Sequence, residues 1–300
     1  MKIAITGATG FVGKYVVDFY QHEELTLFGR SIDRLRKCFS ELEAAGRAHL
    51  VETDYSMSSL KQSFQDFDAI IHLSSLRIQK NNLGFREYAE NIYSTENLIN
   101  VAIEHNISNF IFASSHSVYT GIKDTSFLSE EQRCSPGNFY GVSKLACEHI
   151  ANLSALNVKS LRLAQVVGLG EREGYMLSTF LNQAIAHKPI TLYGQGCGRR
   201  EYVYVRDVVS AIDCAIKKPE VKGVFNIGSG VTTSHRELAE TINKIIAGGH
   251  AEILVDAGKS EDTATHLMDN HKAKEILGWE ARFDLEEMYQ DIKLLLERLK

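Results

Sequence analysis

The sequence KIAITGATGFVG, residues 2–13, decides the fold class of this chain. It opens with a short apolar run rich in β-branched residues, which predicts a buried strand. Gly7, Gly10 and Gly13 follow at once, and residues 12–19 then repeat apolar side chains at helical spacing. A strand, a glycine-rich turn and a helix in this order are the context that a dinucleotide-binding motif requires.

The glycines of this turn each have a physical role. The first permits the tight turn, the second lets the backbone approach a pyrophosphate, and the third allows close packing of helix on strand. The N-terminus of the helix then offers unpaired N–H groups to the phosphates. The spacing here is GxxGxxG. We therefore predict that this turn binds a dinucleotide through Gly7, Thr9, Gly10, Phe11, Val12 and Gly13.

Strand-like and helix-like segments alternate over the first half of the chain. This alternation predicts an α/β protein with a doubly wound parallel sheet, a Rossmann fold. Residues 1–166, with returning segments near 203–229, form the predicted dinucleotide-binding domain. Residues 167–202 and 230–300 form a predicted smaller C-terminal α/β lobe for the substrate. Further strands are expected at 25–29, 49–54, 68–74, 109–115, 158–163, 190–193, 199–205 and 224–228.

Local signals place several helix starts. Asn91 is expected to open a helix, and Asp207 is expected to be the N-cap of a helix that runs through Ile216. Ser234 and Glu237 have the spacing of a capping box.

The second strand ends in Gly29-Arg30-Ser31 instead of in the acidic residue that takes the ribose hydroxyls in NAD-preferring sites. A cation at this point suits a ribose 2′-phosphate. Arg30 therefore favours NADP over NAD as the cofactor. After the third strand, Asp54 stands where a carboxylate could accept a hydrogen bond from the adenine amino group.

Composition narrows the function classes. The chain has 300 residues and a formal charge of -5 at pH 7, which disfavours a general nucleic-acid-binding surface. Its five cysteines are scattered without metal-ligand spacing, so we expect free thiols and no metal site. No apolar run approaches a membrane span, and no signal-peptide layout is present, so a cytoplasmic protein without membrane partners is expected.

The segment YGVSK, residues 140–144, places Tyr140 and Lys144 four residues apart. On a helix this spacing puts both side chains on one face. An ammonium beside a phenol favours the phenolate, so the pKa of Tyr140 is expected to fall and the phenol to exchange a proton near neutral pH. Ser115, at the end of the strand over 109–115, could hydrogen-bond the oxygen that Tyr140 serves.

Together these segments resemble the extended short-chain dehydrogenase/reductase family, in its nucleotide-sugar epimerase/dehydratase branch. TGATGFVG (6–13), NFIFASSHSVYTG (109–121) and YGVSK (140–144) stand in the family's order, as do REYVYVRDVV (200–209), FNIGSG (225–230) and KAKEILGW (272–279). The resemblance implies a homodimer and a nucleotide-sugar substrate. It implies catalytic roles for Ser115, Tyr140 and Lys144, with Lys144 also holding the nicotinamide ribose. It implies further cofactor contacts from Tyr55, Leu73, Ser74, Ser75 and Asn91, and substrate contacts from Ser115, His116, Ser117, Gln165, Arg200 and Lys259.

The sequence departs from the family pattern at three places. His116 and Ser117 occupy the positions of the Asp-Glu pair of the dehydratases, which disfavours 4,6-dehydration. Lys259-Ser260-Glu261-Asp262 replaces a segment that usually supplies a second phosphate-binding arginine, and lysine lacks the bidentate fork. Gln165 replaces the usual asparagine.

Three functions remain open. The motif layout favours an NAD(P)-dependent nucleotide-sugar 4-epimerase. Arg30 favours an NADPH-dependent reductase of 4-keto-sugar nucleotides. A non-catalytic nucleotide-sensing protein on the same fold is the third possibility, and the Ser115, Tyr140 and Lys144 set argues against it.

Overall fold

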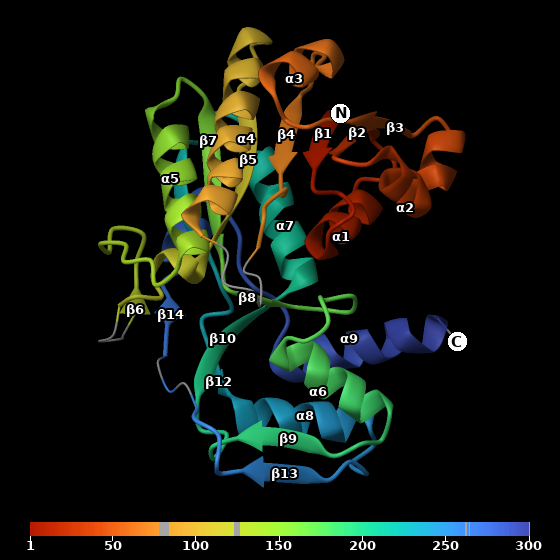
Figure 1. The fold of residues 1–300 in the computed structure, drawn as a ribbon, viewed down its shortest axis with the longest axis vertical. Coiled ribbons are helices and arrows are strands. Elements are labelled where there is room, and N and C mark those ends of the chain that lie inside the picture. Colours follow the sequence, from red (N-terminus) through yellow and green to blue (C-terminus); the bar gives the residue numbers. More distant parts are fainter. Residues whose placement is uncertain (78–83, 123–126, 262, 264, 300) are drawn as a thin grey trace.

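The structure, a computed structural model, describes residues 1–77, 84–122, 127–261, 263 and 265–299. Within these ranges seven parallel strands form one sheet in the order β11-β7-β5-β4-β1-β2-β3 (Figure 1). The strands are β1 (Lys2–Thr6), β2 (Glu24–Gly29), β3 (Ala48–Glu52), β4 (Ala69–His72), β5 (Asn109–Ser115), β7 (Asn157–Leu163) and β11 (Gly223–Ile227). The predicted doubly wound parallel sheet is thus confirmed.

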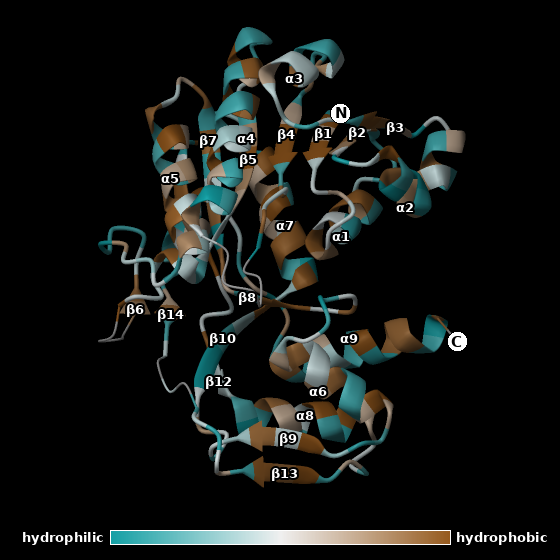
Figure 2. Cartoon of the chain, viewed as in Figure 1, coloured by the Kyte–Doolittle hydropathy of each residue, from teal (hydrophilic) through white to brown (hydrophobic). Residues whose placement is uncertain are grey.

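Helices cover both faces of this sheet. The apolar core therefore forms two layers, one on each side of the sheet. On one face lie α3 (Met57–Ser63), α4 (Phe85–Glu104) and α5 (Phe139–Leu153). On the other lie α1 (Phe11–Phe19), α2 (Ile32–Ala44), α7 (Val205–Ile216) and the π-helical turn Ala273–Leu277. Because both faces are covered, the middle residues of the central strands are mostly apolar, as the brown colour of β1 and β4 shows in Figure 2.

The order in which strands are added to the sheet changes side between β1 and β4, although all of these strands are parallel. The elements that follow β1 build outward through β2 to β3, whereas β4 and β5 continue on its other side. In open parallel sheets ligands bind beyond the carboxyl ends of the strands at such a switch point. The glycine turn after β1 and the serine-rich end of β5 both lie at this edge.

A second group of elements, below the sheet in Figure 1, has its own apolar core. Its helices pack Leu181, Ile242 and Ile292 against one another and against short strands. The group comprises β8 (Gln165–Val167), α6 (Met176–Ile185), β9 (Ile190–Tyr193), β10 (Arg199–Tyr204), β12 (Thr232–Ser234), α8 (His235–Ile246), β13 (Ile253–Asp256) and α9 (Leu285–Arg298). A small pair of strands, β6 (Phe127–Leu128) and β14 (Leu267–Met268), lies beside the sheet. No helix in the described ranges combines the length and apolar character that a membrane span requires.

Two predicted helix starts are wrong. Helix α4 begins at Phe85, after the cap at Gly84, so Asn91 lies inside it and is buried. Helix α7 is capped by Tyr204, and Asp207 lies in its first turn. The capping box of Ser234 and Glu237 at the start of α8 is confirmed.

Tertiary contacts explain the position of Asp207. Its carboxylate accepts hydrogen bonds from the backbone N–H groups of Arg282 and Phe283, at 3.0 and 3.2 Å. The Trp279 indole donates to the Asp207 carbonyl at 3.0 Å. The carboxylate is therefore used to hold the C-terminal segment against α7 instead of closing its own helix end.

Candidate active site

The turn between β1 and α1 leaves no space for side chains. Gly7 has φ +74°, and a Cβ there would lie 2.6 Å from the backbone nitrogen of Ser74. A Cβ at Gly13 would lie 2.2 Å from the carbonyl oxygen of Gly7. The N-cap Gly10 supplies no side-chain cap, so the first N–H groups of α1 stay available to a ligand. This turn fits the pyrophosphate of a dinucleotide, which needs close backbone approach and free N–H donors.

A cavity of about 620 Å³ extends from this turn across the carboxyl ends of the central strands. All but one of the predicted cofactor residues line it, as do four of the predicted substrate residues. These are Gly7, Thr9, Gly10, Phe11, Val12, Gly13, Arg30, Tyr55, Leu73, Ser74, Ser75, Asn91, Tyr140 and Lys144, with Ser115, His116, Ser117 and Gln165. Segments far apart in the sequence thus contribute to one site.

Three predicted residues do not line this cavity. Asp54 is exposed, and its carboxylate accepts a hydrogen bond from the Ser56 N–H at 2.8 Å. Lys259 follows β13 and places its ammonium 4.1 Å from the centre of the Tyr193 ring. Arg200 lies on β10 with a guanidinium N–H 2.7 Å from the Arg199 carbonyl. Asp262, in the segment that departs from the family pattern, lies outside the described residues.

Lys144 is held beneath Tyr140 by the end of β5. Its ammonium donates to the Ala113 carbonyl at 2.7 Å and lies 5.7 Å from the centre of the Tyr140 ring. The lysine is buried, and burial lowers its pKa to about 8. Helix α5, capped at its start by Asn138, therefore brings the two residues together as the spacing predicts.

The expected fall in the pKa of Tyr140 is not found. Burial raises the pKa of Tyr140, and the opposing influences come first from Arg77 and then from the hydroxyls of Ser115 and Ser75. The reason is that the phenol lies in a shielded cavity where the phenolate loses solvation, and Lys144 directs its ammonium to a carbonyl. Burial, opposed first by the charge of Arg77, therefore determines the direction of the pKa shift of this phenol.

Ser115 stands beside the phenol at the end of β5. Its hydroxyl donates to the Ser117 hydroxyl at 3.1 Å and accepts from the Ser117 N–H at the same distance. It also lowers the pKa of Tyr140 by hydrogen bonding. A hydroxyl and a phenol are thus placed to contact one oxygen atom of a ligand.

Asn91 clamps the loop after β4 to the start of α5. Its side chain accepts from the Leu76 N–H at 2.7 Å and donates to the Leu76 carbonyl at 3.0 Å. It also donates to the Ser143 hydroxyl at 3.1 Å, which in turn donates to the Tyr140 carbonyl at 2.8 Å. The asparagine fixes two walls of the cavity relative to each other.

Sequence reasoning missed Arg77, Glu171 and Tyr175, which also line the cavity. The Arg77 guanidinium lies 5.7 Å from the centre of the Tyr175 ring. The positive charge of Arg77 lowers the pKa of Tyr140. Burial raises the pKa of Glu171 to about 7, and Arg77 opposes this rise as well. Arg77 stands only a few residues after a strand end, and this position could have identified it as a site residue from the sequence. No local pattern identifies the loop that carries Glu171.

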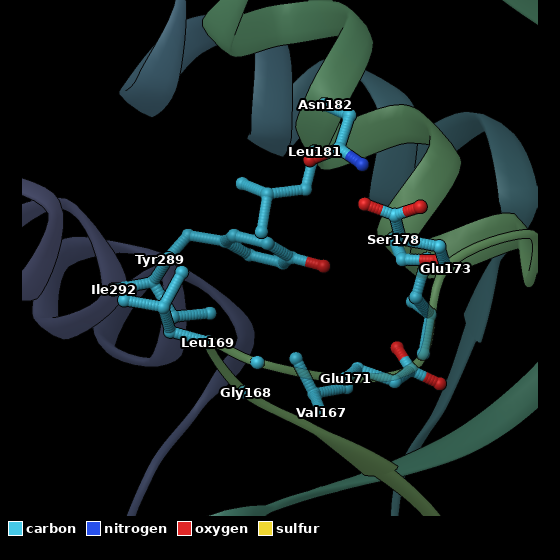
Figure 3. A pocket seen from close by; sticks show the side chains of 12 residues that line it. Val167, Gly168, Leu169, Glu171, Glu173, Ser178, Leu181, Asn182, Tyr289 and Ile292 are labelled. Atoms are coloured by element: carbon cyan, nitrogen blue, oxygen red, sulfur yellow. The ribbon is translucent and has the colours of Figure 1, made fainter. Parts of the chain in front are cut away.

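Glu171 also lines a second cavity of about 230 Å³ behind the connection from β8 to α6. Figure 3 shows the Tyr289 hydroxyl pointing into this space, with Asn182 and Leu181 of α6 beside it. The second cavity includes neither the glycine turn nor Tyr140, so the larger one is the candidate active site. Among the described residues, no group of three or more histidine, cysteine or acidic side chains is arranged to hold a metal ion.

Comparisons with known proteins agree with this geometry. The chain is 28% identical to UDP-glucose 4-epimerase from Caenorhabditis elegans, over 97% of this chain and 96% of that protein. It is 28% identical to dTDP-4-dehydro-6-deoxyglucose reductase from Escherichia coli, over 92% of each. The crystal structure of UDP-N-acetylglucosamine 4-epimerase from Bacillus cereus superposes with a TM-score of 0.85 at 32% identity, covering 100% of this chain and 98% of that one.

The family description that matches residues 3–228 is that of the NAD dependent epimerase/dehydratase family. The match includes the glycine turn, Ser115, Tyr140 and Lys144. The chain therefore belongs to the NAD dependent epimerase/dehydratase family, whose members are enzymes of the extended short-chain dehydrogenase/reductase type.

Proposed function

We propose that this protein is an NAD(P)-dependent 4-epimerase of UDP-sugars. The convergence of Ser115, Tyr140 and Lys144 in the cavity that begins at the glycine turn carries this proposal. A nicotinamide dinucleotide bound there would accept hydride from the sugar C4 and return it. The lobe built from α6, α8 and α9 would hold the rest of the substrate, with Arg200 and Lys259 as candidates for its diphosphate.

The side chains of the cavity would manage the proton at the C4 oxygen. Tyr140 accepts this proton when the carbon is oxidised and returns it when the carbon is reduced. The Ser115 hydroxyl orients the same oxygen, since it contacts the phenol. Lys144 is anchored on the Ala113 carbonyl and would orient a ribose hydroxyl with its remaining N–H groups.

Incubation with UDP-glucose, UDP-galactose and the corresponding N-acetylated pair tests the proposal. We expect interconversion of at least one pair without net oxidation or reduction of the nicotinamide, because the hydride leaves and returns. Net consumption of NADPH with a 4-keto-6-deoxy-sugar nucleotide would instead identify a reductase. Arg30 and the likeness to the Escherichia coli reductase support that second candidate.

We further propose that NADP is preferred to NAD. Arg30 and Arg34 both line the cavity, and the Arg30 guanidinium lies 5.9 Å from the centre of the Tyr55 ring. A charge-assisted hydrogen bond contributes about 1.5–3 kcal/mol. We expect NADPH to bind about tenfold tighter than NADH in a fluorescence titration. Arg30→Ala should remove most of this difference.

Arg36→Ala is the matched control for Arg30→Ala. Arg36 lies on α2, the helix that follows Arg30, pairs with Glu43 at 3.6 Å and does not line the cavity. This variant should keep the wild-type ratio of affinities. Equal affinity of the wild type for both nucleotides would refute the preference.

A homodimer through α4 and α5 is also proposed. Large apolar side chains on this side are exposed: Phe85 by 43%, Tyr93 by 60% and Phe139 by 50%. The Phe85 and Phe139 rings lie 6.0 Å apart, so they form one continuous patch across the two helices. Sedimentation at micromolar concentration should give the mass of two chains. Tyr93→Glu should lower the measured mass toward that of a single chain.

A further inference from the structure

The second cavity, of about 230 Å³ behind the connection from β8 to α6, is separate from the proposed reaction centre. It is larger than the hole of about 150 Å³ that holds one benzene molecule in an engineered protein core. Scaled by volume, it admits a ligand of about six to nine non-hydrogen atoms. None of Ser115, Tyr140 and Lys144 lines this space, so the proposed epimerase reaction leaves it without a use.

Tyr289, on α9, presents an unused polar group to this cavity. The residue is only 1% exposed, and Figure 3 shows its hydroxyl pointing into the space. Within the described residues this hydroxyl has no hydrogen-bond partner. The sealed side-chain atoms that lack a partner there are Gln183 Oε1 and the Tyr202 hydroxyl, so a ligand can reach the hydroxyl of Tyr289. A buried hydroxyl without a partner is unfavourable, and this one is placed to gain a partner from a ligand.

The lining of the cavity carries negative charge. Glu171 and Glu173 both line it, and Figure 3 shows them across the space from the Tyr289 ring. No lysine, arginine or histidine is among the described residues that line it. The Ser178 hydroxyl already donates to backbone carbonyls of the preceding loop, at 2.9 and 3.0 Å. A complementary ligand is therefore a small cation whose N–H groups can donate to the two carboxylates.

Glu171 is the half-buried member of this pair of carboxylates, and burial raises its pKa to about 7. The Arg77 guanidinium opposes this rise from the larger cavity, where it lies 5.7 Å from the centre of the Tyr175 ring. At pH 8 the ionised form of Glu171 prevails. Charges that leave water are normally paired. On the side of the second cavity Glu171 is not paired within the described residues, which points to a cationic ligand.

We propose that the second cavity binds a short aliphatic primary amine, whose ammonium group contacts the carboxylates of Glu171 and Glu173 and the Tyr289 hydroxyl. The alkyl chain of the ligand would lie against Leu181 and Ile292, which supply part of the apolar lining. The volume of the cavity limits this chain to a few carbon atoms. The site is separate from the proposed reaction and does not depend on it.

An NMR titration with n-butylamine tests the proposal, with 1-butanol as the neutral ligand of the same length. The protein is saturated with its nicotinamide dinucleotide, so that the larger cavity is occupied, and is kept at pH 8 and low ionic strength, where the amine is protonated. Butylamine should bind at least tenfold tighter than 1-butanol. Glu171→Gln should weaken the amine about tenfold, the effect of one charge-assisted hydrogen bond, and should leave 1-butanol unchanged.

Tyr289→Phe provides a second variant, because Tyr289 lines the second cavity and not the larger one. It removes only the hydroxyl, and it should weaken the amine about threefold, the effect of one neutral hydrogen bond. Its affinity for the dinucleotide should equal that of the wild type, which would show that the fold is intact.

Glu240→Gln is the matched control, because Glu240 is exposed on α8 and lines neither cavity. It should keep the wild-type affinity for butylamine. An equal loss in Glu240→Gln and Glu171→Gln would overturn the proposal, since the amine would then respond only to the formal charge of -5 of the whole chain. Equal affinity for butylamine and 1-butanol, undetectable binding of the amine, or an unchanged affinity in both Glu171→Gln and Tyr289→Phe would overturn it as well.

Discussion

Tyr140→Phe is expected to lower the rate of UDP-sugar interconversion by about 100- to 10,000-fold, the range that a positioned general acid–base contributes. Phenylalanine keeps the ring in place but removes the hydroxyl that would exchange the C4 proton. Since the backbone of Tyr140 stays tied to Ser143 and Asn91, the walls of the cavity should not move. The measurement is kcat with the sugar pair that the wild type interconverts, together with the affinity for NAD(P)H by fluorescence.

Tyr93→Phe is the control for this variant. Tyr93 is 60% exposed on α4, and the substitution again removes only a phenol hydroxyl. It should change neither kcat nor cofactor affinity. If Tyr140→Phe kept turnover within tenfold of the wild type, the assignment of the proton to this phenol would be wrong. If cofactor binding fell together with turnover, the loss would reflect damage to the cavity instead of to the proton transfer.

The sheet and the main contacts of the site were predictable because they follow from local patterns. Strand β5 was expected over 109–115 and has those bounds, since an apolar run buried on both faces is distinctive. Gly7 was identifiable from the glycine turn that follows the first strand. The structure shows why glycine is needed there: its φ is positive, and a Cβ would collide with Ser74. The pairing of Tyr140 with Lys144 follows from the helical period.

What could not be predicted depends on neighbours that the sequence does not place. The pKa of Tyr140 is governed by burial and by Arg77, which lies on another loop. Asn91 reads as a helix start by residue type, yet its amide is needed inside α4 to hold Leu76 and Ser143. Asp207 resembles an N-cap, but the backbone it satisfies belongs to residues 282–283. In each case a tertiary contact overrides the local preference.

Arg162→Met is expected to destabilise the fold by about 3–5 kcal/mol, because it leaves a buried carboxylate without its counter-charge. Arg162 on β7 and Glu148 on α5 are 5% and 3% exposed and meet through three N–O contacts of 2.7 to 3.2 Å. Ser114 also donates to this carboxylate, and the Arg162 guanidinium donates to the Tyr119 hydroxyl. The pair therefore ties α5, which carries Lys144, to β7, and the Ser114 hydroxyl joins the same carboxylate to the end of β5 that carries Ser115. Denaturant unfolding measures the loss.

The double variant Glu148→Leu/Arg162→Met separates the cost of an unpaired charge from the value of the pair itself. Replacing a whole buried ion pair by apolar side chains is often neutral, so the double variant should recover most of the stability that Arg162→Met loses. Lys244→Met is the control at an exposed pair: Lys244 and Glu286 are 68% and 53% exposed, and their separation should cost at most about 1 kcal/mol. A loss in Arg162→Met no larger than in this control would mean that solvent reaches the Glu148 carboxylate. If the double variant recovers stability but not turnover, the main role of the ion pair is to fix the relative positions of Ser115 and Lys144, and not to stabilise the fold.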